Sequence, residues 1–152
     1  MSYEIYTDYL HKVYNPKEFK AVINKATNKI KEFRKKNKFD SIAFCGMSGA
    51  SIAYPLSYNL GIPLTCIRKP GKNHFSNNRT YSLEGAINFN KYIIVDDFIC
   101  SGNTVNKIIK TINKCSDNNT QLLGIYLFDK NLSESVYDNE FESIIGSIAI
   151  IN

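Results

Sequence analysis

The sequence has few of the residues that build disulfide frameworks or metal centres. Its 152 residues include four cysteines and two histidines. No two cysteines form a CxxC pair, and His11 and His74 are not spaced to complete a metal site with them. We therefore expect four free thiols. Three of the four lie in or beside apolar segments, so we expect those three to be buried as small hydrophobic side chains.

Long hydrophobic runs are also missing. No apolar segment approaches the roughly 18 residues that a membrane span requires. The first residues, MSYEIYTDYLHK, do not show the basic and then apolar pattern of a secretory signal, so we expect a soluble, cytoplasmic protein. A hydrophobic fraction of 43% and a charged fraction of 22% are ordinary for a globular chain. We expect residues 1–152 to form a single domain.

The net charge of +5 is not organised as in a nucleic-acid-binding protein. No basic run is longer than RKK at residues 34–36, and the aromatic residues do not alternate with lysines in a stacking pattern. Binding to nucleic acid is therefore not expected. We interpret the surplus positive charge as local, serving a small polyanionic ligand.

Strand-like and helix-like patterns alternate along most of the chain. Amphipathic periodicity predicts helices over residues 15–38, 52–60 and 105–112, the first of them capped by Asn15 and Pro16. Short apolar runs predict buried strands at residues 41–45, 62–67, 92–95, 121–128 and 143–151. Residues 69–90 lack such periodicity and are interpreted as a long loop that can include a short hairpin.

This alternation predicts an α/β fold with an open, mostly parallel central sheet, right-handed crossovers and helices on both faces. Ligands of such folds bind at the carboxyl ends of the strands. Three segments meet at that edge: the turn after residue 45, the residues after 67 and the turn after 95. We expect the binding site to lie there.

The turn within YIIVDDFICSGNT, residues 92–104, has the features of an anion site. Asp96 and Asp97 directly follow the apolar strand. The next helix begins after a small, hydroxyl-rich turn, where backbone N–H groups and hydroxyls can surround a phosphate monoester. The carboxylates would repel that phosphate, so they suit the hydroxyls of an attached sugar, or a metal ion carried with the phosphates. The simpler alternative is an acidic strand end followed by a capped helix.

VDDFICSGNT resembles the phosphoribosyl-pyrophosphate signature of type I phosphoribosyltransferases, which is matched by Asp96, Asp97, Ser101, Gly102 and Thr104. SIAFCGMSGA and the residues after it are similar to the adenine phosphoribosyltransferase branch, whose Arg-Lys-x-Gly-Lys segment is matched at residues 68–72. TYSLEG, residues 80–85, resembles the mobile catalytic loop of that branch. The likeness runs from about Asn15 to Ile112.

The resemblance implies an enzyme that transfers ribose 5-phosphate from phosphoribosyl pyrophosphate to a purine base, with adenine as the first candidate, and releases pyrophosphate. Asp96 and Asp97 would bind the ribose hydroxyls, and Glu84 would assist a proton transfer at the base or support its loop. The substrate-binding residues implied are Cys100, Ser101, Gly102, Asn103 and Thr104 for the 5-phosphate; Arg68, Lys69, Lys72, Met47, Ser48 and Gly49 for the pyrophosphate; and Phe98 and Ile99 for the base.

The resemblance also implies Mg²⁺ carried by the substrate near Asp96 and Asp97, without a dedicated protein ligand, and a homodimer. The chain departs from the family at Ser48, where the adenine branch usually has an arginine, and at Gly85, which replaces an aromatic residue. The part before Asn15 suggests a reduced base-covering hood, and the tail after Asn131 has no counterpart. Two alternatives stay open: transfer to orotate or another pyrimidine, and a non-catalytic regulator that binds phosphoribosyl pyrophosphate or nucleotides.

Overall fold

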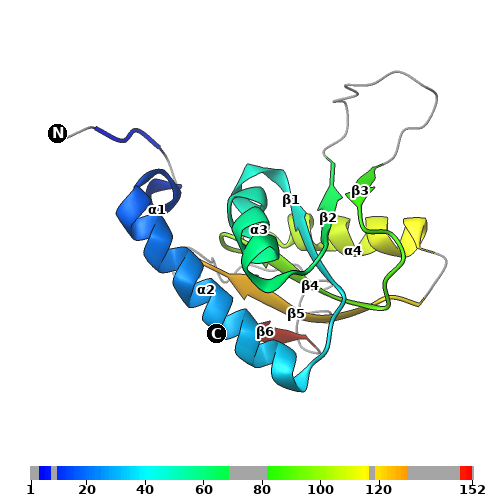
Figure 1. Ribbon diagram of the computed structural model, residues 1–152. Coiled ribbons are helices and arrows are strands. Elements are labelled where there is room, and N and C mark those ends of the chain that lie inside the picture. Colours follow the sequence, from blue (N-terminus) through cyan, green and yellow to red (C-terminus); the bar gives the residue numbers. More distant parts are fainter. Residues whose placement is uncertain (1–3, 8–9, 69–81, 117–118, 130–147, 152) are drawn as a thin grey trace.

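The computed structural model describes residues 4–7, 10–68, 82–116, 119–129 and 148–151. In these segments one sheet of six strands is formed, in the order β3-β2-β1-β4-β5-β6 (Figure 1). The strands are β1 (Ser41–Cys45), β2 (Leu64–Ile67), β3 (Leu83–Gly85), β4 (Lys91–Asp96), β5 (Gln121–Leu127) and β6 (Ala149–Ile151). All neighbours pair in parallel except β3, which is antiparallel to β2. The predicted α/β class and mostly parallel sheet are confirmed.

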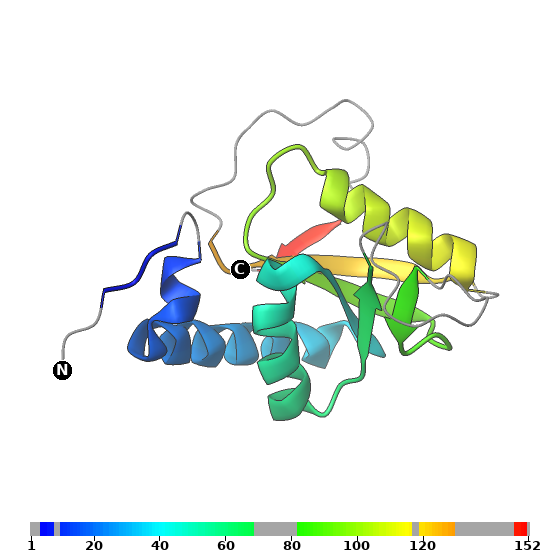
Figure 2. The same ribbon diagram turned by 90° about the horizontal axis from the view of Figure 1, so that it is seen from above.

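Helices cover both faces of the sheet (Figure 2). α2 (Pro16–Lys36) and α3 (Gly46–Leu60) lie on one face, α4 (Asn103–Cys115) lies on the other, and a short α1 (His11–Tyr14) precedes α2. Successive side chains of β4 (Lys91–Asp96) point to opposite faces of the sheet, so they belong to two separate parts of the hydrophobic core. Ile93 and Val95 pack with α2 and α3, whereas Tyr92 and Ile94 pack with α4. Burial on both faces explains why the strands are continuous apolar runs.

The N-terminus of α2 is capped as the sequence predicts. The side chain of Asn15 accepts hydrogen bonds from the backbone N–H groups of Lys17 and Glu18, at 3.1 and 3.3 Å. Ile23, Ala26 and Ile30 form the buried face of the helix. The helix then runs along the sheet, and α1, which precedes it, lies near the ends of β4 and β5 (Figure 1).

α3 differs from the prediction, because it begins at Gly46, directly after β1, and not at Ile52. The segment GMSGA was expected to be a turn and forms instead the first part of the helix. Gly49 permits this early start: a Cβ atom there would lie 3.0 Å from both Phe44 Cβ and the carbonyl oxygen of Val95. The helix therefore packs against β1 and β4 from its first turn.

The cysteines are less buried than predicted. All four lie in the described segments and none forms a disulfide, as expected. Only Cys45 is buried, Cys66 is intermediate, and Cys100 and Cys115 are exposed. Cys100 lies in the loop after β4 and Cys115 ends α4, so proximity to an apolar segment did not bury them.

Two further predictions concern the chain as a whole. None of the helices in the described segments has the length and hydropathy that a transmembrane span requires. The single domain over residues 1–152 stays a prediction, since it includes segments outside the described residues.

Candidate active site

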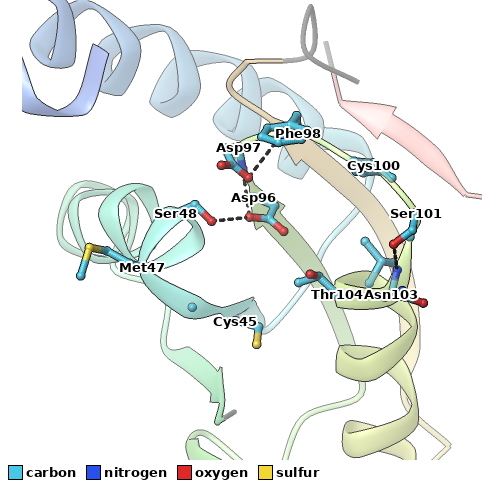
Figure 3. A pocket seen from close by; sticks show the side chains of 14 residues that line it. Cys45, Met47, Ser48, Asp96, Asp97, Phe98, Cys100, Ser101, Asn103 and Thr104 are labelled. Carbon is cyan, nitrogen blue, oxygen red and sulfur yellow. Dashed lines mark hydrogen bonds between the residues drawn. The ribbon is translucent and has the colours of Figure 1, made fainter. Parts of the chain in front are cut away.

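A cavity of about 270 Å³ opens at the carboxyl ends of β1 and β4 (Figure 3). One wall is the end of β1 with the first turn of α3, and the other is the β4–α4 loop with the first turn of α4. The lining residues are Cys45, Gly46, Met47, Ser48, Asp96, Asp97, Phe98, Ile99, Cys100, Ser101, Gly102, Asn103, Thr104 and Val105. Two of the three expected strand ends thus meet in one cavity, at the edge where parallel sheets bind ligands.

The two carboxylates of this cavity are buried and fixed. Asp96 and Asp97 are 4% and 6% exposed. Oδ1 of Asp96 accepts hydrogen bonds from the Ser48 hydroxyl and the Asp97 backbone N–H, both at 3.0 Å, and Oδ1 of Asp97 accepts one from the N–H of Phe98 at 2.9 Å. Figure 3 shows the second oxygen of Asp96 directed away from Ser48, toward the side of the cavity where Thr104 lies.

The backbone beneath the carboxylates is held by the end of β5. The carbonyl oxygens of Asp96 and Asp97 accept hydrogen bonds from the N–H groups of Phe128 and Asp129, at 3.2 and 2.8 Å. Asp129 in turn binds the Lys12 ammonium of α1 through its carboxylate, with Nζ 3.0 Å from Oδ1. The strand pairing therefore continues to the rim of the site, and α1 is attached there.

Burial raises the pKa of Asp96 to about 7, and the neighbouring Asp97 carboxyl acts in the same direction. The N–H of Asp97 and the hydroxyl of Ser48 oppose this rise, because both donate hydrogen bonds to the ionised carboxylate. Asp96 consequently changes charge near neutral pH. A carboxyl group whose pKa is shifted by burial and by a neighbouring charge, inside a cleft, is typical of functional sites.

The loop opposite the carboxylates suits an anion. Cys100, Ser101, Asn103 and Thr104 are exposed around the N-terminus of α4. Gly102 provides the N-cap in a left-handed conformation, φ +80°, which few other residues adopt without strain. The first turn of α4 contains no acidic residue, so its N–H groups and the positive end of its dipole are open to a negatively charged ligand.

The structure brings most of the predicted site residues together. Met47, Ser48 and every residue from 96 to 104 line the cavity. Gly49 does not, because it is buried against Phe44 and Val95. Ile99 lines the cavity and is also a buried member of the α4-side core, so both interpretations of this residue hold.

Arg68 and Glu84 lie away from the cavity lining. Glu84 is on β3, and β2 and β1 separate this strand from β4. The Arg68 guanidinium binds the Glu84 carboxylate, with Nη1 2.5 Å from Oε1. The backbone N–H of Arg68 also donates to the carbonyl of Ser82 at 2.9 Å. These contacts join the two ends of segment 69–81; Lys69, Lys72, His74, Arg79 and Tyr81 lie within it, outside the described residues.

Sequence reasoning missed Cys45 and Val105 as lining residues, and it missed the link between Lys12 and Asp129. Cys45 ends a predicted strand and Val105 begins a predicted helix, and nothing in either apolar segment marks the residue as part of a site. Asp129 could have been found, because it follows β5 in the way that Asp96 and Asp97 end β4. The short α1 had no periodic pattern to reveal it.

Residues 11–131 match the family model of the phosphoribosyl transferase domain. With this fold and site, the chain belongs to the phosphoribosyltransferase family. An adenine phosphoribosyltransferase from Treponema denticola is 32% identical over 104 residues, covering 60% of this chain and 53% of the relative. The match thus spans about half the length of that relative.

Solved structures agree on the fold. Adenine phosphoribosyltransferase from Saccharomyces cerevisiae, crystallised with adenine and an imino-altritol bisphosphate, superposes with a TM-score of 0.66 at 21% identity, covering 95% of this chain and 83% of that one. Orotate phosphoribosyltransferase from Mycobacterium tuberculosis, in complex with phosphoribosyl pyrophosphate, gives 0.63 at 11% identity, covering 95% and 78%. The predicted type I phosphoribosyltransferase fold and family are confirmed, and at these identities the structures establish the fold alone.

Proposed function

We propose that the chain transfers ribose 5-phosphate from phosphoribosyl pyrophosphate to a nitrogen of a purine base, adenine first, and releases pyrophosphate. The observation that carries this proposal is one cavity with an anion-suited loop, residues 100–104, beside the buried carboxylates of Asp96 and Asp97. A sugar phosphate presents the matching chemistry, with a phosphate at one end and hydroxyls at the other. The adenine phosphoribosyltransferase among the relatives supports the choice of base.

The proposed roles follow from the chemistry of each group. The backbone N–H groups and hydroxyls of residues 100–104 hold the 5-phosphate. Asp96 and Asp97 accept hydrogen bonds from the ribose hydroxyls, which aligns the reacting carbon with the base. Their negative charge also stabilises the oxocarbenium-like transition state, and the burial of both side chains strengthens this effect. Phe98 and Ile99 border the base.

The charge of the cavity favours a bound cation. Among the described residues, the lining includes two carboxylates and neither lysine nor arginine, whereas the proposed substrate is a polyanion. Within the described segments no group of three or more His, Cys, Asp or Glu side chains is placed to hold a metal ion. Asp96 and Asp97 are the residues that would lie beside a Mg²⁺ carried by the substrate. When bound, this ion would neutralise charge on the pyrophosphate leaving group.

Lys69 and Lys72 are proposed as further contacts to pyrophosphate, together with the backbone at Met47 and Ser48. Arg68 precedes these lysines directly. Glu84 is proposed to support the loop, because its ion pair with Arg68 lies where segment 69–81 leaves and rejoins the sheet. A part in proton transfer at the base would require Glu84 to leave that ion pair.

We further propose a homodimer formed through α3. The helix sequence, GMSGASIAYPLSYNL, contains no charged residue, although the chain carries a net charge of +5. Its outer face exposes Met47, Tyr54 and Tyr58, at 69%, 62% and 89%. These residues are spaced by seven and four positions, which places them on one side of the helix. Met and Tyr are frequent at protein interfaces.

The absence of charge on α3 favours a second copy of this chain as the partner that binds its exposed face. Two copies that met through lysine-rich faces would repel each other, whereas two α3 helices can meet about a two-fold axis without like charges in contact. Met47 belongs both to the exposed face and to the cavity lining. A second copy seated on α3 would therefore border the mouth of the site.

The alternative of orotate transfer rests on the fold shared with the orotate enzyme. Orotate carries a carboxylate, and no cationic side chain among the described lining residues is available to bind it. A neutral purine is therefore preferred. The test is incubation with phosphoribosyl pyrophosphate, Mg²⁺ and, in separate reactions, adenine, hypoxanthine, guanine, orotate or uracil, followed by assays of nucleotide and pyrophosphate. We expect AMP; binding without turnover of any base would instead support the non-catalytic regulator.

A further inference from the structure

One side-chain contact crosses the cavity between elements that are far apart in the sequence. Ser48 lies near the start of α3, and its hydroxyl donates to Oδ1 of Asp96 at the end of β4, 3.0 Å away. Both residues line the cavity. Figure 3 shows this hydrogen bond linking the two walls of the site.

We infer that Ser48 is a positioning residue for Asp96: its hydroxyl holds Oδ1, so that the other carboxylate oxygen is presented to the ligand. The inference deepens the proposed function and rests on it only for the identity of that ligand. The Asp97 N–H also donates to Oδ1. Two donors on one oxygen fix the rotation of the carboxyl group, and the burial of Asp96 leaves it little room to turn.

A hydroxyl suits this position because it can both donate and accept. It donates to Asp96 when the carboxylate is ionised. It can accept from the carboxyl group when Asp96 is protonated, whereas the backbone N–H of Asp97 can only donate. Ser48 can thus orient Asp96 in both charge states, and its donated hydrogen bond favours the ionised form.

Several other polar groups lie near Asp96. Asp97 is the adjacent acid, and Cys45 of β1 and Cys100 of the loop line the same cavity. Asp129 lies behind Asp97 and is bound by Lys12. Among the described lining residues there is no lysine, arginine or histidine. Loss of the Ser48 hydroxyl would remove one of the two donors to Oδ1 of Asp96 named above and leave the Asp97 N–H in place.

Ser51 offers a matched control on the same helix. Its hydroxyl donates to the carbonyl oxygen of Ser48 at 2.6 Å, a contact within the helix, and Ser51 does not line the cavity. Ser48→Ala and Ser51→Ala remove the same atom one turn apart. Alanine is a strong helix former, so both variants are expected to fold. Ser48→Thr retains a hydroxyl and serves as the conservative variant.

The test is a crystal structure of each variant together with binding of ribose 5-phosphate, measured by isothermal titration calorimetry. In Ser48→Ala we expect the Asp96 carboxyl group to rotate from its parent position and the affinity for ribose 5-phosphate to fall about tenfold, the size of one hydrogen bond to a charged group. Ser48→Thr and Ser51→Ala should keep the carboxyl orientation and the affinity of the parent protein. An unrotated Asp96 carboxyl in Ser48→Ala, or an equal loss of affinity in Ser51→Ala, would overturn the inference.

Kinetics provide a second readout if transfer occurs. Loss of positioning should lower kcat/KM in Ser48→Ala and leave it unchanged in Ser51→Ala. The two proposals fail separately. A rotated Asp96 carboxyl in Ser48→Ala, with no turnover of any base by the parent protein, would retain the positioning role and reject the transferase. Turnover by the parent protein with an unrotated carboxyl in Ser48→Ala would do the reverse.

Discussion

The backbone N–H of Asp97 donates a hydrogen bond to Oδ1 of Asp96, 3.0 Å away, so the second member of the acidic pair helps to hold the first. The arrangement keeps two carboxylates side by side at the end of β4 although both are buried. Adjacent buried carboxylates raise each other's cost of ionisation. Two such carboxylates in one cavity are explained if a ligand with hydroxyl groups, or a cation, stabilises their ionised form.

The acidic pair should be essential for transfer. We expect Asp96→Asn combined with Asp97→Asn to lower kcat/KM by at least about 100- to 1000-fold, since the negative charge beside the transition state is removed. Asp40→Asn is the matched control. Asp40 lies at the other end of the sheet, where its carboxylate accepts hydrogen bonds from the N–H groups of Asn90 and Lys91. Unchanged rates in the double variant, with an unaltered circular dichroism spectrum, would reject the assigned role.

Stability should depend on pH through Asp96. Its pKa in the folded chain, about 7, lies above its ordinary value of 3.8, so the folded state binds this proton more tightly than the unfolded state. The stabilising effect of protonation is therefore full below about pH 4 and is lost as the pH rises through 7. It amounts to at most about 4 kcal/mol.

Urea unfolding of the parent protein and of Asp96→Asn across this pH range measures the effect. We expect the difference in unfolding free energy between the two to change in favour of the variant as the pH rises from 5 to about 8. Titrating groups remote from Asp96 are common to both proteins and cancel, so the change with pH reports the coupled pair Asp96 and Asp97. A difference that stays constant with pH would show that Asp96 does not titrate as described.

The exposed face of α3 should govern assembly. We expect the parent protein to sediment as a dimer and Tyr54→Lys with Tyr58→Lys to sediment as a monomer, because four lysines would then meet across the two-fold axis. Tyr6→Lys is the control, since Tyr6 is 93% exposed and lies outside α3. A monomeric parent protein, or a lysine variant that remains dimeric, contradicts the proposed interface.

Gly49 should act through packing. In Gly49→Ala the new methyl group would lie 3.0 Å from Phe44 Cβ and from the carbonyl oxygen of Val95, so α3 must shift away from the sheet. We expect a loss of about 1 to 3 kcal/mol in unfolding free energy, reduced by the better helix propensity of alanine. Urea unfolding is the measurement. A fully stable variant that has lost only ligand affinity would favour the substrate contact predicted from the sequence.

Turnover should require Mg²⁺. The described lining residues supply two carboxylates and no lysine or arginine, so the pyrophosphate group lacks a counter-charge from them when the metal is removed. We expect EDTA to abolish nucleotide formation and added Mg²⁺ to restore it. Full activity in excess chelator would assign charge neutralisation to cationic side chains such as Lys69 and Lys72.

Much of the fold could be predicted because the strands are buried on both faces and therefore appear as short apolar runs. The acidic pair could be placed at the edge of the sheet because it ends such a run. The start of α3 could not be predicted, because the small residues of GMSGA have no helical periodicity. Their conformation depends on the close approach of Gly49 to β1 and β4, and such tertiary packing cannot be inferred from a local sequence pattern.

The contacts between distant segments could not be predicted for a related reason. Ser48 and Asp96 are separated by 48 positions, and Lys12 and Asp129 by 117. Each is an unremarkable polar residue in its own segment. The exposure of Cys100 likewise depends on how the loop crosses the end of the sheet. Only the folded arrangement decides which of these side chains share a surface.

The most direct test is a crystal structure of the protein with phosphoribosyl pyrophosphate and Mg²⁺. It should place the 5-phosphate within hydrogen-bonding distance of the backbone N–H groups of residues 101–104, and the ribose hydroxyls against Asp96 and Asp97. A ligand bound elsewhere, or bound here with its phosphate remote from the start of α4, would contradict the account.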